Sequence, residues 1–259
     1  ATSVPRAAFA WVTKKLMGKV SIPIITSNRI NTPKVAEEVL EAGCADMVSM
    51  ARPFLADPNF IKKAMSGNEK KIAPCIACNQ ACLDHTFSGK ISSCLVNPKA
   101  CFETELVSTK ALNKKSVAVI GAGPAGMSAA VEAAQRGHSV TLFEKAQAIG
   151  GQLNLAKMVP GKEEFWGLVD WFEEMLKSSG VDVRLGKTVT STDVIEFDEV
   201  IVATGVIPRD PKIKGQEENN VLSYTEVLKG GRKIGQKVAV VGAGGIGFDV
   251  SEYLVHESR

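Results

Sequence analysis

The stretch Ser116 to Gly126, SVAVIGAGPAG, decides the fold of the larger part of this chain. Its first five residues are β-branched or small and predict a short buried strand, Ser116 to Ile120. A glycine-rich turn follows at once and opens a segment of helical character. A strand, a G-x-G-x-x-G turn and a helix in this order are typical of a dinucleotide-binding βαβ unit, so we expect an α/β fold.

The residues of this turn have separate physical roles. The first glycine allows a tight turn, the second lets backbone N–H groups approach a pyrophosphate, and the third lets the helix pack closely on the strand. An acid ends the next predicted strand, Val140 to Phe143, where it can accept hydrogen bonds from ribose hydroxyls. The predicted cofactor contacts of this unit are Gly121, Gly123, Pro124, Ala125, Gly126 and Glu144.

Two later motifs favour FAD over NAD as the cofactor of this unit. The tripeptide GGQ, 150–152, follows the acid at a distance suited to a second backbone approach on a long cofactor, and ATG, 203–205, follows the predicted strand Glu199 to Val202. Both resemble motifs of flavoproteins that contain two dinucleotide-binding domains. The FAD contacts predicted from these motifs are Gly151, Gln152, Ala203, Thr204 and Gly205.

A second glycine-rich turn predicts a site for NAD(P)H. It follows a predicted strand, Lys237 to Val241, and opens a helix that runs toward Leu254. Its predicted contacts are Gly242, Gly244, Gly245 and Gly247. The sequence does not choose between NADPH and NADH. The acid or arginine that would contact the ribose is expected after the strand that follows this helix, and the printed sequence does not include that strand. A degenerate turn that binds nothing is the alternative interpretation.

Four closely spaced cysteines predict a 4Fe-4S cluster. Cys75, Cys78 and Cys82 are separated by two and three residues, and Cys94 follows them. Three thiolates on one loop and a fourth from a later turn suit a cubane that needs one thiolate for each iron. Structural zinc is the next choice, and disulfides are disfavoured in a reducing compartment. The remaining cysteines, Cys44 and Cys101, are interpreted as packing residues.

The N-terminal segment predicts the last quarter of a (β/α)8 barrel. It has strands at Ile22 to Thr26 and Asp46 to Met50, a helix from Pro33 to Leu40, and a helix that begins near Asp57 with that carboxylate as its N-cap. The loops after the last two barrel strands commonly bind a phosphate. The FMN phosphate contacts predicted there are Asn28, Arg29, Met50, Ala51 and Arg52, with structural ion pairs as the alternative for the two arginines.

Composition excludes several other classes of function. The chain has 259 residues, 45% of them hydrophobic, and a formal net charge of +3 that is scattered along the sequence. No basic stripe indicates nucleic acid, and no apolar run is long enough to cross a membrane. A cytoplasmic protein is expected. Both ends look cut, so we expect the chain to be an internal piece of a longer protein.

Four segments follow from these motifs. They are residues 1–66, the C-terminal quarter of an FMN-binding barrel; 67–112, the iron–sulfur segment and linker; 113–233, an incomplete FAD-binding domain; and 234–259, the start of an NAD(P)H-binding domain. No cysteine follows Cys101, so thiol–disulfide exchange is not expected in the nucleotide-binding segments.

Taken together, these segments resemble a known family. The stretches VSMARPFLADP (48–58), CIACNQACLDHTFSGKISSCLVNP (75–98), VAVIGAGPAGMSAA (117–130), IGGQLNLA (149–156), VPGKEEF (159–165) and VGAGGIGFDV (241–250) look like those of bacterial NADPH-dependent 2,4-dienoyl-CoA reductases. More broadly, the chain resembles the old-yellow-enzyme-related NADH:flavin oxidoreductases, which include trimethylamine dehydrogenase and 2-enoate reductases.

The resemblance implies an electron path. NAD(P)H reduces FAD, the cluster passes electrons singly to FMN, and FMN reduces a 2,4-dienoyl-CoA in the oxidation of unsaturated fatty acids. A small acyl-CoA substrate is implied, with no nucleic acid or membrane as a partner. No catalytic acid is assigned. The alternatives are a related 2-enoate reductase, NADH oxidase or amine dehydrogenase, or an electron-transfer module similar to a glutamate synthase small subunit.

Overall fold

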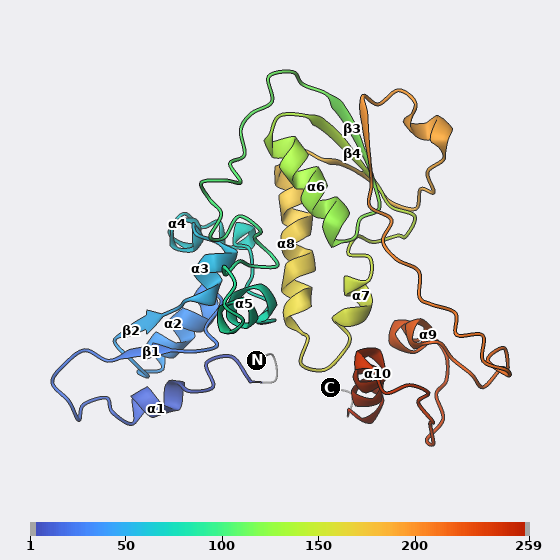
Figure 1. Ribbon diagram of the computed structural model, residues 1–259. Coiled ribbons are helices and arrows are strands. Elements are labelled where there is room, and N and C mark those ends of the chain that lie inside the picture. Colours follow the sequence, from blue (N-terminus) through green and yellow to red (C-terminus); the bar gives the residue numbers. More distant parts are fainter. Residues whose placement is uncertain (1–3, 257–259) are drawn as a thin grey trace. The chain divides into compact units, whose positions relative to one another are not determined.

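The computed structural model describes residues 4–256, and it divides the chain into two compact units (Figure 1). Unit 1 comprises Ala1–Thr109 and Asp170–Met175, and unit 2 comprises Lys110–Val169 and Leu176–Arg259. The outermost residues of the first and last predicted segments, 1–3 and 257–259, lie outside the described residues. Each unit contains a parallel sheet connected through helices, so the predicted α/β fold class is confirmed.

Unit 1 begins with two strand–helix repeats. The strands β1 (Ile25–Ser27) and β2 (Met47–Ser49) pair in parallel, with their last residues side by side in register. Between them, α2 (Pro33–Glu41) begins where the Thr32 hydroxyl accepts the Val35 N–H, with proline in the first turn. Helix α2 packs against β2 through a small apolar core. The other helices of this part are α1 (Ala10–Lys14), α3 (Arg52–Ala56) and α4 (Phe60–Met65).

The helix predicted from about Asp57 forms as α4, but it begins later and Asp57 is not its N-cap. Helix α3 ends at Ala56, and α4 begins only at Phe60, with no side-chain hydrogen bond to its N-cap. The Asp57 side chain is buried and accepts the Asn59 N–H, 2.9 Å, but it also accepts the Ala73 N–H at 2.9 Å. A contact 16 residues along the chain competes with local capping, and local sequence does not reveal it.

The cysteine segment of unit 1 has little regular structure. It contains a short 3-10 helix, η1 (Glu69–Lys71), one π-helical turn, η2 (Gln80–Asp84), and α5 (His85–Phe87). A π-helical turn widens the backbone and is frequent at functional sites. Here it carries Cys82.

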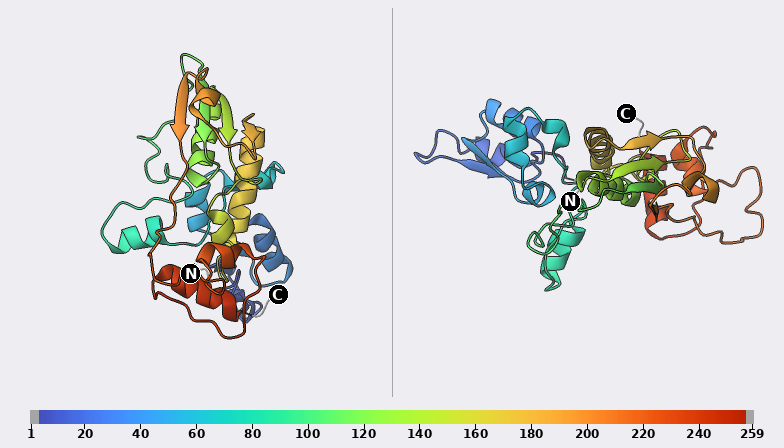
Figure 2. Two further views of the ribbon diagram at one scale, coloured as in Figure 1. Left: turned by 90° about the vertical axis from the view of Figure 1, so that its right-hand side faces the viewer. Right: turned by 90° about the horizontal axis from the view of Figure 1, so that it is seen from above.

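Unit 2 is built on a four-stranded parallel sheet in the order β5-β4-β3-β6 (Figures 1 and 2). The strands β3 (Ser116–Ile120) and β6 (Glu199–Val202) have the predicted bounds, while β4 is Ser139–Phe143 and β5 is Asp182–Arg184. The middle residues of β3 and β4 are buried, as expected for strands of a parallel sheet that is covered by helices.

The helices of unit 2 follow the strands. Helix α6 (Pro124–Gln135) packs against β3 and β4, and α8 (Glu164–Ser178) precedes β5. The others are α7 (Leu153–Ala156), η3 (Ser191–Val194), α9 (Tyr224–Lys229) and α10 (Gly245–Val255). The helix predicted after the second glycine-rich turn is therefore confirmed as α10.

The strand predicted at Lys237 to Val241 is not formed. The segment has no regular secondary structure and pairs with no strand among the described residues, and the side chain of Val241 is 82% exposed. A strand requires a hydrogen-bonded neighbour, and β-branched composition alone cannot supply one. The turn and the helix after it form without that strand.

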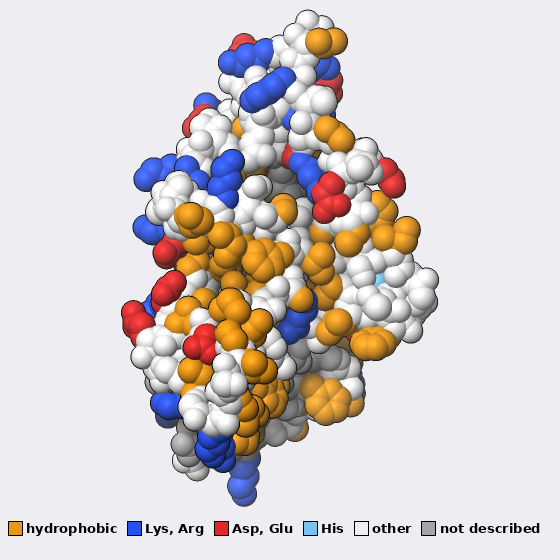
Figure 3. Space-filling model, turned by 90° about the vertical axis from the view of Figure 1, so that its left-hand side faces the viewer, with side chains coloured by type: hydrophobic (Ala, Val, Ile, Leu, Met, Phe, Trp, Pro, Cys, Tyr) orange, Lys and Arg blue, Asp and Glu red, His pale blue; other side chains and the backbone are white. Residues whose placement is uncertain are grey.

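Figure 3 shows a face on which hydrophobic side chains gather. Unit 1 has several large apolar residues in contact with solvent, among them Trp11, Ile22, Ile25 and Met47. Ile25 and Met47 belong to β1 and β2, so one side of this two-stranded sheet is uncovered. Within residues 4–256, no helix combines the length and the apolar character needed to cross a membrane.

Candidate functional site

The four predicted ligand cysteines line one cavity in unit 1. Cys75, Cys78, Cys82 and Cys94 surround it, and its empty space is about 300 Å³, part of which is open to solvent. All four are half-buried. The remaining walls are apolar except for Arg52 and Asn79. The four cysteines predicted from their spacing thus share one cavity, which Cys44 and Cys101 do not line, and their role as cluster ligands stays a prediction.

The thiols influence one another across this cavity. Burial raises the pKa of the Cys75 thiol, and the neighbouring Cys94 and Cys78 raise it further, while Arg52 acts in the opposite direction. Burial also raises the pKa of Cys78, with further increases from Cys82 and Cys94. The raised pKa values of Cys75 and Cys78 disfavour two neighbouring thiolates, and a positively charged metal bound between the sulfurs would stabilise them.

Within residues 4–256, no group of three or more His, Cys, Asp or Glu side chains has the geometry to hold a metal ion. One tetrahedral ion needs all its ligand atoms at one bond length from a common centre. A polynuclear cluster needs each thiolate at a different iron, and so tolerates a wider separation of the sulfurs.

Two loops at the carboxyl ends of β1 and β2 hold the cysteine segment. The Asn31 amide donates a hydrogen bond to the Cys75 carbonyl at 3.2 Å. The Arg52 guanidinium donates to the side-chain oxygen of Asn79, which lies between Cys78 and Cys82. Asn31 is 4% exposed, and its Oδ1 atom has no hydrogen-bond partner among the described residues. Sequence reasoning missed Asn31, because its contact lies 44 residues away.

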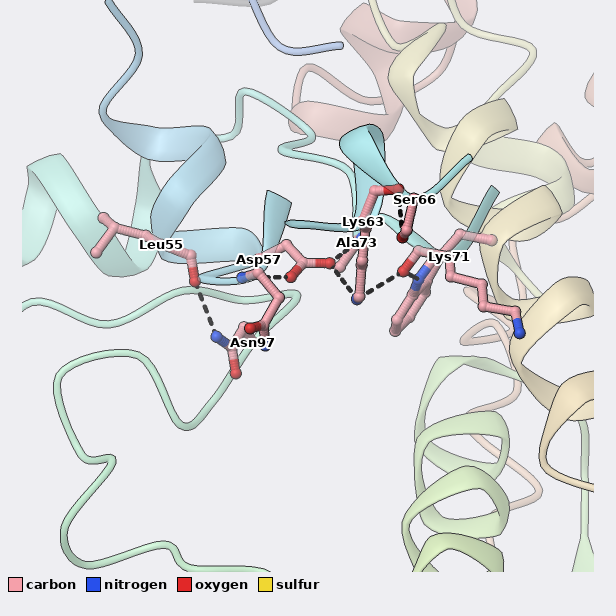
Figure 4. Close-up of polar contacts among 9 residues, drawn as sticks. Leu55, Asp57, Lys63, Ser66, Lys71, Ala73 and Asn97 are labelled. Atoms are coloured by element: carbon pink, nitrogen blue, oxygen red, sulfur yellow. Dashed lines mark hydrogen bonds and ion pairs between the residues drawn. The ribbon is translucent and has the colours of Figure 1, made fainter. Parts of the chain in front are cut away.

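A third anchor lies just before the first cysteine (Figure 4). The Asp57 carboxylate accepts the Ala73 N–H and an ion-pair hydrogen bond from Lys63, at 2.9 and 2.5 Å. The same ammonium donates to the Lys71 carbonyl at 2.8 Å. In addition, Asn97 donates to the Leu55 carbonyl at 2.9 Å, just after the fourth cysteine. The segment is thus tied to α3 and α4 on both sides of the cavity.

The residues predicted to bind an FMN phosphate lie at one edge of the β1–β2 sheet. Because Ser27 pairs with Ser49, the residues that follow both strands emerge at that edge. Asn28 and Arg29 both have left-handed backbone conformations, with φ of 83° and 55°. Consecutive non-glycine residues of this kind are strained and are concentrated at functional sites.

The side chains of this group make different contacts. Arg29 is buried and donates from Nε to the Val4 carbonyl at 2.7 Å, whereas Arg52 points into the cysteine cavity. Met50 packs on the core of α2, and Ala51 is the N-cap of α3. The structure therefore does not bring the two guanidinium groups to one cradle, and the FMN phosphate contacts stay a prediction.

In unit 2, the first glycine-rich turn is closely packed. A Cβ atom at Gly126 would lie 1.8 Å from the Gly121 carbonyl oxygen, and one at Gly121 would lie 2.4 Å from the Ala203 carbonyl oxygen. The backbone therefore needs glycine at both positions. A Cβ atom at Gly123 would meet nothing within 4 Å apart from its immediate neighbours. Packing does not explain the glycine at 123, and the room above it suits a ligand that approaches the backbone.

The other predicted FAD residues converge on this turn. The Glu144 carboxylate accepts the Ala122 N–H at 2.8 Å, and the Gly150 N–H donates to the Ala122 carbonyl at 2.8 Å. The Gln152 amide donates to the Val206 carbonyl at 2.9 Å, just after the ATG tripeptide 203–205. Segments 121–126, 144, 150–152 and 203–206 therefore form one site at the carboxyl ends of β3, β4 and β6.

The second glycine-rich turn reproduces one feature of the first. A Cβ atom at Gly247 would lie 2.1 Å from the Gly242 carbonyl oxygen, the counterpart of the contact between Gly126 and Gly121. The positions Gly244 and Gly245 have open space. An ion pair between Lys162 and Asp249, 2.5 Å, attaches α10 to the loop before α8. The local geometry is that of a dinucleotide turn without its preceding strand.

Comparisons with known proteins match both units. The model of the family described as pyridine nucleotide-disulphide oxidoreductase matches residues 115–257, and that of the NADH:flavin oxidoreductase / NADH oxidase family matches residues 1–71. The chain is 41% identical to a metal reductase of Desulforamulus reducens over 97% of this chain and 39% of that protein. It is 39% identical to an NADH oxidase of Thermoanaerobacter brockii over 95% of this chain and 39% of that protein.

A solved structure is also similar. The complex of a 2-naphthoyl-CoA reductase with 2-naphthoyl-CoA has a TM-score of 0.94 at 32% identity, over 98% of this chain and 39% of that chain. The chain spans about two fifths of the length of these three proteins, 39% in each case.

Proposed function

Because the chain belongs to the pyridine nucleotide-disulphide oxidoreductase family, we propose that it is the electron-transfer part of an NAD(P)H-dependent flavin oxidoreductase. In this proposal electrons pass from NAD(P)H through FAD and a 4Fe-4S cluster to FMN. The observation that carries the proposal is the meeting of four cysteine side chains at one cavity in a chain that also has a closely packed dinucleotide turn.

The four-cysteine site fits an iron–sulfur cluster by its chemistry. All four potential ligands are soft sulfur atoms, and no histidine or carboxylate lines the cavity within the described residues. Mostly apolar walls limit access of water to the sulfurs, which is one determinant of a cluster's reduction potential. Zinc remains the competing metal, and the dinucleotide-binding turn of the same chain favours a redox-active cluster, because zinc carries no electrons.

The glycine-rich turn fits FAD. Gly123 offers an unobstructed backbone for the pyrophosphate, and the N-terminus of α6 directs its N–H groups and positive dipole end toward that position. Glu144 holds the turn by accepting the Ala122 N–H, and its position at the end of β4 suits contact with a ribose. The turn before α10 would bind NAD(P)H in the same manner.

When bound, FAD would accept a hydride from NAD(P)H and the cluster would accept and release one electron at a time. The family's description includes disulphide reduction, but the sequence from residue 102 onward has no cysteine. A redox cysteine pair next to FAD is therefore absent from the matched nucleotide-binding part, and the four cysteines of unit 1 are assigned to electron transfer.

The electron acceptor is proposed as a conjugated carbon–carbon double bond, as in a 2-enoate reductase. The similarity to a 2-naphthoyl-CoA reductase favours a conjugated acyl-CoA thioester within that class, of which 2,4-dienoyl-CoA is a narrower case. The similarity to an NADH oxidase favours a second candidate function, in which dioxygen is the electron acceptor. An amine dehydrogenase is a further alternative.

Paired cysteine variants test the electron path. We expect Cys94→Ser to remove iron and acid-labile sulfide from anaerobically purified protein, because a cluster loses one of its four thiolates. Cys101→Ser, which removes a cysteine outside the cavity, is the matched control and should retain both. NADPH should still bleach FAD in the Cys94→Ser protein. Equal iron content in the two variants would contradict the assignment.

A second assay addresses the acceptor. With NADPH in excess, a conjugated enoyl-CoA or dienoyl-CoA should be consumed in step with NADPH, whereas the saturated acyl-CoA should not be. Oxidation of NADPH that depends on dioxygen and ignores every conjugated acyl-CoA and enoate would instead select the NADH oxidase candidate.

A further inference from the structure

Arg52, one of the residues predicted to contact an FMN phosphate, also lines the cysteine cavity. It is the first residue of α3, shortly after the end of β2 at Ser49, and its half-buried side chain lines the cavity shared by the four cysteines. Its guanidinium donates a hydrogen bond to the side-chain oxygen of Asn79. The prediction of an FMN phosphate contact does not account for either feature.

The partner of this hydrogen bond is itself constrained. Asn79 has a left-handed backbone conformation, with φ of 63°, and is the N-cap of the π-helical turn that carries Cys82. A non-glycine residue pays a conformational cost in this region and keeps the conformation only where its surroundings fix it. The hydrogen bond from Arg52 is such a constraint, and it acts on the turn that separates Cys78 from Cys82.

Arg52 is also the only permanently charged side chain among the described residues that line the cavity. The other lining residues are cysteines, apolar residues and Asn79. In apolar surroundings a fixed charge acts more strongly than in water, because little solvent screens it. An arginine keeps its positive charge at every relevant pH.

We propose that Arg52 is a positioning residue of the four-cysteine site, which fixes the turn between Cys78 and Cys82 through Asn79 and favours the reduced state of the redox group bound there. This inference rests on the proposed function, because it requires that the group be redox-active. One electron from the flavin that NAD(P)H reduces adds one negative charge to the group, without a proton or a new bond. A nearby guanidinium stabilises the more negative state.

The test is a reductive titration of the cofactor-loaded, anaerobically purified protein, followed by electron paramagnetic resonance of the reduced cluster. Arg52→Gln removes the charge and keeps an amide that can reach Asn79. We expect its equilibrium constant for one-electron reduction to fall about tenfold, which is about 59 mV for a one-electron step. Arg52→Lys retains the charge and should shift much less.

Lys34→Gln is the matched control, because it removes one positive charge from a side chain of α2 that is 82% exposed. Its potential should equal that of the wild type, since water and salt screen such a charge. An unchanged potential in Arg52→Gln at full iron and sulfide content would overturn the inference and leave the proposed function intact. Absence of iron and sulfide in the wild type would overturn both.

If Arg52→Gln loses the cluster, Arg52→Lys shows whether the charge or the shape of the side chain is required. A Lys variant with full iron and sulfide would support the requirement for a positive charge. A Lys variant that also loses its iron would show that the residue acts through its shape alone, and would overturn the electrostatic part. Asn79→Gly completes the set: it cuts the hydrogen bond, tolerates the positive φ and keeps the charge, so we expect faster cluster loss to a chelator at a nearly unchanged potential.

Discussion

Asp57 shows how a single buried acid can organise a segment that has no regular structure. Its side chain is 3% exposed and has partners on both oxygens: Oδ1 accepts the Asn59 N–H, and Oδ2 accepts the Ala73 N–H and the Lys63 ammonium. The sequence predicted only a local cap at this position. The contact with Ala73 depends on how the chain returns after α4, and it places the backbone that leads into Cys75.

We expect Asp57→Asn to lower the free energy of unfolding by about 2–3 kcal/mol, because the variant loses charge-assisted hydrogen bonds and directs an amide N–H at other donors. Urea denaturation at neutral pH measures this change. Glu38→Gln is the matched control: it breaks the exposed pair with Lys34 and should cost less than about 0.5 kcal/mol. Equal losses in the two variants would contradict the role given to Asp57.

At the scale of elements, sequence predicted best where the determinants are local. The strand β3, the glycine-rich turn and α6 are consecutive in the chain, and each is specified by its own residues. The segment before Gly242 had the same composition but formed no strand, because strand pairing depends on a neighbour that composition does not specify. The loops that hold the cysteines were not predictable for the same reason: Asn31 and Cys75 are distant in sequence.

Substitution of Gly126 and of Gly123 in the first glycine-rich turn should affect different properties, stability in one case and FAD binding in the other. Gly126→Ala places a methyl group on a backbone oxygen, so we expect a loss of stability of about 3 kcal/mol, the upper end for overpacking. Gly123 has φ of −76°, which alanine adopts freely, so Gly123→Ala should fold with equal or slightly higher stability and bind less FAD. Thermal unfolding and flavin content separate the two effects. A Gly123→Ala protein with full FAD content would contradict the pyrophosphate site.

The pairing of β3 with β6 should depend on pH. The Asp198 carboxylate accepts hydrogen bonds from the Ser116 hydroxyl and N–H, both at 2.7 Å, and these bonds lower the pKa of Asp198. A folded-state pKa below the unfolded value of about 3.9 gives stability that is present above that pH and is lost as pH falls through the folded value.

Asp198→Asn should therefore be less stable than the wild type at pH 7, and the difference should shrink below about pH 4. Urea midpoints of both proteins at pH 7 and pH 3 measure it. A difference that is the same at both pH values would show that the carboxylate charge contributes nothing to the pairing.

At the scale of the whole molecule, the family and the fold class could be predicted from the sequence, and the contacts that hold the cysteine segment could not. The sequence indicated a flavin oxidoreductase through its alternating strands and helices, its cysteine spacing and its two glycine-rich turns. The family matches agree with this prediction. The position of Arg52 at the cysteine cavity, and its hydrogen bond to Asn79, are visible only in the structure. The spacing of the cysteines in the sequence indicates which of them share a cavity, whereas the residues that contact the cysteine segment depend on tertiary packing.

The central claim is that one chain holds a redox cluster and a flavin that NADPH or NADH reduces. Anaerobic purification followed by assay of iron, acid-labile sulfide and flavin, with spectra before and after addition of NADPH or NADH, tests it most directly. The account predicts about four irons and four sulfides per chain, bound FAD, and loss of flavin and cluster absorbance on addition of NADPH or NADH. Zinc without sulfide, or a flavin that neither NADPH nor NADH reduces, would contradict it.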